Sequence, residues 1–235
     1  MISTEGNDGR AAPLAARDEA LIRGLADGLT PVRRLHPPAR RVAAWLGAVG
    51  VGVLIMVPFF DWGEVMPRVT ASPDAWLAIV GSALTAVAAA IATVRLGLPD
   101  ASRVWALLPL PFAALWLGAS GIGCMRVVPL ADGPTVAGAQ DSGDCFFFIV
   151  GVSVPLALIL AMILRRSYTL HPLLLTQMAG LACAAASATL LVLIHPFQIS
   201  WLDLGMHALA VALVMLAAWA AGMPMLRRTF SGDAM

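Results

Sequence analysis

The alternation of apolar and polar positions divides the chain into six long apolar runs and a more polar N-terminal segment. Each run has the roughly 20 residues that a helix needs to cross a hydrocarbon core. The runs cover residues 42–60, 75–94, 104–123, 145–164, 172–194 and 203–226. Lipid offers no partners for backbone N–H and C=O groups, so spanning segments must be helical. The pattern therefore predicts an all-α polytopic membrane protein with six transmembrane helices over 42–226, an N-terminal segment over 1–41 and a tail over 227–235.

A second pattern, with helical spacing, lies in residues 14–29. Four large apolar residues recur on one stripe of a short amphipathic helix: Leu21, Ile22, Leu25 and Leu29. We expect the charged residues to lie elsewhere on that helix: Arg17, Asp18, Arg23 and Asp27. Thr30-Pro31 should end the helix, because the residue before a proline is pushed out of the α region.

Residues 31–41, PVRRLHPPARR, contain three prolines and two arginine pairs. The prolines predict an extended, stiff arm that lasts until the first span begins near Val42. The helix and the arm have two interpretations. In the first, the leucine stripe lies on the inner leaflet and the arginines contact anionic head groups. In the second, the stripe fills a groove on a cytosolic protein and the arginines orient that partner.

Composition and charge agree with a membrane protein and give its orientation. Hydrophobic residues make up 60% of the chain and charged residues 12%, and the net charge of +1 provides no field that would attract nucleic acid. Thirteen of the fifteen basic residues fall on one side of the predicted spans: Arg10, Arg17, Arg23, Arg33, Arg34, Arg40, Arg41, Arg95, Arg103, Arg165, Arg166, Arg227 and Arg228. The other side has Arg68 and Arg126. Because basic residues accumulate in cytoplasmic segments, both termini are predicted to be cytoplasmic.

The spans themselves contain almost no ionisable side chains at their centres, which disfavours an ion-coupled transporter. Small residues in the first and fifth spans predict close helix packing within the bundle. They are Gly47, Gly50 and Gly52 in the first span, and Gly180, Ala184 and Ser187 in the fifth. Cys183, in the run ACAAAS, is expected to be a packing residue as well.

The other two cysteines, Cys124 and Cys145, close the third span and open the fourth on the outer side. If that side is an oxidising compartment, the two thiols can form a disulfide that staples the intervening loop. They can also act as a redox- or metal-responsive pair, or have no role.

His195 and His207, near the outer ends of the last two spans, can join Cys124 and Cys145 as ligands of a thiophilic metal. Their spacing matches no metal-binding motif, and interfacial histidines commonly form hydrogen bonds only. No catalytic motif such as HExxH or GxSxG appears, so the chain is not expected to be an enzyme or to hold a resident cofactor. The only ligand of this kind that the sequence suggests is a heavy-metal ion that binds transiently.

Several stretches together resemble the NrsF-like family of bacterial inner-membrane regulators. They are LIRGLADGLTPVRRLHPPARR before the first span, Arg165-Arg166 followed by His171-Pro172, and HPFQISWLDLGMH between the last two spans. The resemblance implies a membrane-bound anti-sigma factor that binds an extracytoplasmic-function (ECF) sigma factor of the sigma-F type and releases it under stress, such as heavy metals. It implies that the partner-binding residues are Leu21, Ile22, Leu25, Leu29, Pro31, Val32, Arg33, Arg34, Leu35, Pro37 and Pro38.

The resemblance also implies that outward-facing cysteines are the sensor. Cys145 matches the first cysteine of the family, but the second, expected after the histidine of the fifth-to-sixth connection, is Pro196 here. Either Cys124 replaces it as the partner of Cys145, which is the interpretation we favour, or the chain senses another signal, or it does not sense through a thiol pair. Two other classes of function are alternatives. A membrane thiol oxidoreductase would use Cys124 and Cys145 as an exchanging pair, although it would be expected to have a CxxC motif. The second alternative is a small metal transporter or an accessory subunit of one.

Overall fold

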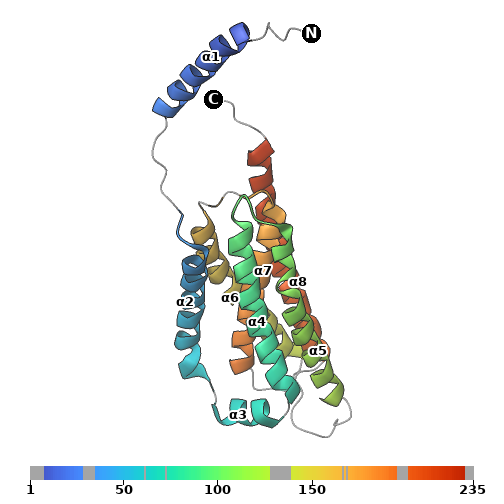
Figure 1. Ribbon diagram of the computed structural model, residues 1–235. Coiled ribbons are helices and arrows are strands. Elements are labelled where there is room, and N and C mark those ends of the chain that lie inside the picture. The colour runs from blue at the N-terminus through green and yellow to red at the C-terminus, as the bar shows by residue number, and fades with distance from the viewer. Residues whose placement is uncertain are drawn as a thin grey trace. The chain divides into compact units, whose positions relative to one another are not determined.

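The computed structural model describes residues 8–28, 35–60, 62–71, 73–127, 139–165, 167, 169–194 and 201–230. The chain divides into two compact units, residues 1–35 and 36–235. In the first unit, helix α1 runs from Asp8 to Asp27. The second unit is a bundle of helices (Figure 1).

The bundle confirms the prediction of an all-α protein, since its described regular elements are all helices. These are α2 (Pro38–Met56), η1 (Val57–Phe59), α3 (Trp62–Ala71), α4 (Pro73–Leu96), η2 (Arg103–Leu107), α5 (Leu110–Val127), α6 (Ala139–Leu164), α7 (Pro172–Ile194) and α8 (Trp201–Phe230). Six segments are long and apolar enough to cross a membrane: Pro38–Phe59, Pro73–Leu96, Arg103–Met125, Gly143–Leu164, Pro172–Val192 and Leu204–Gly222.

Helices α4 and α7 form the centre of the bundle and make its most extensive contacts with each other. Both contribute mainly small side chains to the core, including Ala89 and Ala92 of α4 and Ala182 and Ala185 of α7. Small residues allow two backbones to approach closely, and this approach replaces the hydrophobic driving force that lipid cannot supply. The central pair is therefore packed largely backbone to backbone.

Hydroxyl groups connect the buried helices where the alanines leave room. Thr189 of α7 donates to Ser82 of α4 at 2.9 Å. The hydroxyls of Ser153 on α6 and Ser187 on α7 lie 3.1 Å apart. In a bundle surrounded by lipid, such hydrogen bonds each contribute about 0.6 kcal/mol on average. They fix the register of three helices against one another.

Close helix packing was correctly expected for the fifth span but not for the first. A Cβ at Gly180 would lie 3.0 Å from the Cβ of Ala218, so α7 touches α8 there. A Cβ at Gly47, Gly50 or Gly52 would meet no atom within 4 Å. The expectation that these three glycines pack the bundle was wrong, because no other helix in the described part of the chain approaches their Cα atoms closely enough to need the missing side chain.

Helix α3 is an element that the apolar runs did not predict. It follows α2 and lies across the end of the bundle opposite to the start of α2 (Figure 1). The rings of Phe60 and Trp62 meet edge to face at its start, with centroids 5.4 Å apart. Trp62 and Met66 are exposed, which is the character of a helix that lies in the interface between lipid and water.

Candidate functional site

The apolar stripe of α1 is the first part of the predicted partner-binding region. Leu21, Ile22 and Leu25 lie on this helix and are each more than 60% exposed. The helix is longer than the predicted 14–29 at its start and ends at Asp27, before Leu29. Five further predicted binding residues lie outside the described residues: Leu29, Pro31, Val32, Arg33 and Arg34.

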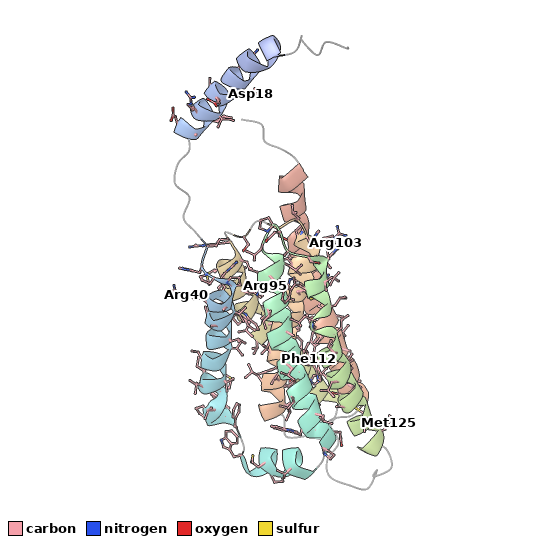
Figure 2. All side chains as sticks on the ribbon, in the orientation of Figure 1. Asp18, Arg40, Arg95, Arg103, Phe112 and Met125 are labelled. Carbon is pink, nitrogen blue, oxygen red and sulfur yellow. The ribbon has the colours of Figure 1, made fainter. Side chains whose placement is uncertain are left out.

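One charged residue of α1 lies where we did not expect it. Asp18 precedes Leu21 by three residues and Ile22 by four, so helical geometry places it on the same face as the apolar stripe. The expectation that Asp18 lies elsewhere on the helix was therefore wrong. The polar face instead carries an exposed ion pair between Glu19 and Arg23, with 2.7 Å between their charged atoms. Figure 2 labels Asp18 on α1.

The arm meets the bundle earlier than predicted. Helix α2 begins at Pro38, and Pro37 before it has an extended backbone, with φ of −52° and ψ of 143°. Proline suits the first helical position, because its missing N–H would have no helical partner there and its φ is already helical. Pro37-Pro38 thus starts the helix, and the prediction of an extended arm up to residue 41 was wrong for residues 38–41. Leu35, the last residue of the first unit, is exposed.

The second arginine pair, Arg40 and Arg41, lies in the first turn of α2, and the two residues differ in exposure and in hydrogen-bond partners. Arg40 is exposed and lies near His36, with 3.5 Å between its Nη1 and the Nδ1 of His36. Arg41 is buried. Its guanidinium donates to the carbonyl oxygen of Ile163 at 3.2 Å and to the hydroxyl of Ser167. Both arginines were expected to orient the chain in the membrane and to contact head groups or a partner protein; the contact of Arg41 with α6 was not predicted.

Four residues further along α2, Trp45 is fully buried and also reaches α6. Its Nε1–H donates to the carbonyl oxygen of Leu156 at 3.3 Å. Trp45 was not among the predicted functional residues either. The i, i+4 spacing of a cation and an aromatic residue was the signal for a shared face, because residues at that spacing are neighbours on a helix surface.

The connection between α6 and α7 joins this contact to α4. Thr169 donates to the carbonyl oxygen of Leu96, at the end of α4, at 2.6 Å. A Cβ at Gly97 would lie 3.1 Å from the hydroxyl oxygen of Ser167. Ser167 therefore lies between Arg41 and the end of α4, and a larger residue at position 97 would displace it.

Further arginines gather at this same end of the bundle, which we call the arginine-rich end. Arg103 donates to Nε2 of His171 at 3.3 Å, and the guanidinium of Arg95 lies 4.9 Å from the ring centroid of Trp105. Figure 2 shows Arg40, Arg95 and Arg103 at this end and Met125 at the opposite end. The grouping follows from the alternating directions of the six spanning segments.

The opposite end carries the predicted sensor cysteines, and both are buried. Cys124 on α5 is 1% exposed and Cys145 on α6 is 3% exposed. All three cysteines of the chain are described and each is a thiol, so the alternative of a Cys124–Cys145 disulfide is not realised in this structure. Cys145 belongs to an apolar cluster with Ile149 of α6, Leu191 of α7 and Ala210 of α8. Cys183 is buried in the alanine core, as expected.

The predicted metal ligands are only partly described. His207 lies on α8, one turn before Ala210 of the Cys145 cluster, and is half-buried. His195 lies outside the described residues. In the part of the chain that the structure describes, no three His, Cys, Asp or Glu side chains are grouped to hold a metal ion. The carboxylate of Asp74, in the first turn of α4, lies against Gly123, where a Cβ would be 3.2 Å from Oδ2.

The chain matches the profile of a known protein family over most of its length. The profile of the family NrsF, described as negative regulator of sigma F, matches residues 25–227. No curated protein and no solved structure matches the chain. The match includes the end of α1, the arm and the whole bundle as far as the last turns of α8.

Proposed function

The chain belongs to the NrsF family of negative regulators of sigma F, and from this premise we propose that it holds an ECF sigma factor at the bacterial inner membrane through α1 and the arm. The arginine-rich end is then cytoplasmic, as the positive-inside rule requires, and both termini face the sigma factor. Binding blocks the surface through which the sigma factor contacts RNA polymerase. Release follows a change at the cysteine-bearing end, which faces the periplasm.

The observation that carries this proposal is the exposed apolar stripe on α1. Leu21, Ile22 and Leu25 share one face and are exposed. Most helical stability in proteins comes from packing of an amphipathic face, so a partner that covers the stripe would also stabilise the helix. An amphipathic helix of this kind suits a hydrophobic groove on a protein.

Asp18 distinguishes a protein groove from the alternative of an anionic lipid surface. Its carboxylate lies on the apolar face, beside Leu21 and Ile22. Laying that face on the inner leaflet would press the carboxylate toward negatively charged head groups, which repel it. A protein groove can place a cation at its rim to pair with Asp18. The position of Asp18 therefore favours the sigma factor over the membrane as the partner of α1.

The direct test is retention of the sigma factor by the full chain in lipid nanodiscs. We expect Leu21→Asp/Leu25→Asp to abolish retention, because two charges on the stripe would have to be buried without partners. The matched control is Glu19→Gln/Arg23→Gln, which alters the polar face of the same helix and should leave retention unchanged. Arg33→Glu/Arg34→Glu tests the arm in the same assay. Equal retention by the stripe variant and its control would contradict the proposal.

Cys124 and Cys145 are proposed as the sensor of heavy-metal or redox stress. Their support is their position, at the end of the bundle opposite to the arginine-rich end, on helices that connect the two ends (Figure 1). Since both thiols are buried, a metal or oxidant that reaches Cys145 must separate α6 from α7 and α8. Such a displacement is the differential interaction that a two-state switch requires. A heavy-metal ion would be a transient ligand here rather than a resident cofactor.

We expect Cys124→Ala and Cys145→Ala each to lower metal or oxidant induction of a reporter gene transcribed with the sigma factor. Alanine preserves the apolar surroundings, so basal repression should stay near the wild-type level. Cys183→Ala is the matched control, because Cys183 is equally buried but lies in the middle of α7. Wild-type induction in both test variants would remove these thiols from the mechanism.

A further inference from the structure

Helix α2 carries the arm, yet it is the spanning helix with the least attachment to the bundle. Only two of its residues, Arg41 and Trp45, are buried. They lie four positions apart, and therefore on one face, and each donates a hydrogen bond to a backbone carbonyl of α6. Val51, Leu54 and Ile55 are exposed. Arg41 and Trp45 are thus the buried side chains that join the start of α2 to α6, while the partly buried Leu46 and Val49 pack against the same core.

The electrostatics of Arg41 suit α6 rather than its own helix. A cation in the first turn of α2 opposes the positive N-terminal end of that helix dipole, and α2 has no acidic residue there. Ile163 is among the last four residues of α6, whose carbonyl groups have no partners within the helix. The guanidinium therefore caps the negative C-terminal end of α6, where a cation is favourable.

This attachment is also suited to release. The described hydrogen bonds of Arg41 go to a carbonyl and a hydroxyl, with no carboxylate among them. Neutral acceptors hold a cation less strongly than an ionised partner does. Arg41 lies at the start of a spanning helix, so its long side chain can turn back into the aqueous interface when its acceptors move.

We propose that Arg41 and Trp45 are positioning residues that fasten α2, and through it the arm, to α6. The inference rests on the proposed function, because it assigns to α2 the task of presenting the sigma-binding segment. Helix α6 also carries Cys145 near its other end. One helix thus connects the cysteine-bearing end to the attachment of the arm. A displacement of α6 withdraws the acceptors of Arg41 and Trp45 and frees the start of α2.

The first test measures the attachment itself, without the sigma factor. Nitroxide labels are placed at Ala39→Cys and Leu170→Cys, both exposed positions at the arginine-rich end. The labels are attached to the full chain in nanodiscs, with the three native cysteines replaced by alanine. We expect a narrow distance distribution that Arg41→Gln broadens. Trp45→Phe, which keeps the apolar ring and removes only the Nε1 donor, should broaden it less, and Arg41→Lys should partly restore it.

The matched control is Arg40→Gln, which removes the same charge from the same turn but contacts no other helix among the described residues. It should leave the distribution unchanged. Retention of the sigma factor is measured on the same variants without labels. A coupling of the usual size would lower retention by about five-fold or more in Arg41→Gln, with Arg40→Gln close to wild type.

The two readouts separate the inference from the proposed function. If the wild-type chain retains no sigma factor, the proposed function fails, while the distance distributions still decide whether Arg41 and Trp45 fasten α2. Unchanged distributions in Arg41→Gln/Trp45→Phe would overturn the inference. So would a broadened distribution with retention equal to that of Arg40→Gln, since the attachment would then not position the arm.

Discussion

Helices α7 and α2 span the same bundle but are held in opposite ways. Buried residues follow one another along α7, and it contacts α4, α6 and α8 through alanine, glycine and serine. By contrast, α2 has only two buried residues, whose long side chains reach α6, and a Cβ on any of its glycines would meet no atom within 4 Å. The difference separates two parts of the bundle: a rigid framework, formed by α4, α5, α6, α7 and α8, and one attached helix, α2. Small residues make a contact that cannot be shifted without a clash, whereas Arg41 and Trp45 make one that can open.

The largest effect is expected where two backbones of the framework meet. A Cβ at Gly81 of α4 would lie 2.8 Å from the backbone nitrogen and 2.9 Å from the Cα of Trp116 on α5. Backbone atoms cannot rotate away, so Gly81→Ala must separate the helices. We expect a loss of about 1–3 kcal/mol in the free energy of unfolding, as is usual for an overpacked core. Unfolding of the purified protein in mixed micelles would measure it.

A smaller effect is expected at the hydroxyl contacts of the framework. Ser187→Ala removes the hydrogen bond to Ser153 and leaves the backbone spacing intact. We expect a loss of about 0.6 kcal/mol in the free energy of unfolding, the average for such bonds between membrane helices. A loss larger than that of Gly81→Ala would reverse the ranking of the two kinds of contact.

The smallest effect is expected on α2. A Cβ at Gly47 meets no atom within 4 Å, so Gly47→Ala should change the free energy of unfolding by no more than about 0.5 kcal/mol. The substitution is chemically identical to Gly81→Ala and differs only in its surroundings. Equal destabilisation by the two alanines would erase the distinction between framework and attached helix.

The sequence predicted the six spans because hydropathy over 20 residues is a local property of the chain. It did not predict which way each helix faces. Gly47 and Gly81 look alike in an apolar run, and Arg40 and Arg41 are adjacent and identical in type. The rotation of α2 about its own axis decides which arginine reaches α6, and that rotation depends on tertiary contacts that local patterns do not contain.

The site was predictable to a similar extent. The stripe on α1 follows from its i, i+4 spacing and was recognised, but the same geometry should have placed Asp18 beside it. The burial of Cys124 and Cys145 follows from neighbours on other helices, such as Ala210 on α8 for Cys145. Helix α3 was missed because it is short, contains Pro67 and lacks a long apolar run.

Helix α3 has a mechanical consequence for α2. A tight turn between α2 and α4 would couple any movement of one directly to the other. Instead, η1 and the ten residues of α3 separate them, and α3 lies across the end of the bundle (Figure 1). This length of chain means that α2 and α4 are not joined by a tight turn. With η1 and α3 at one end of α2 and the arm at the other, we expect the start of α2 to separate from α6 without unfolding of the core between α4 and α7.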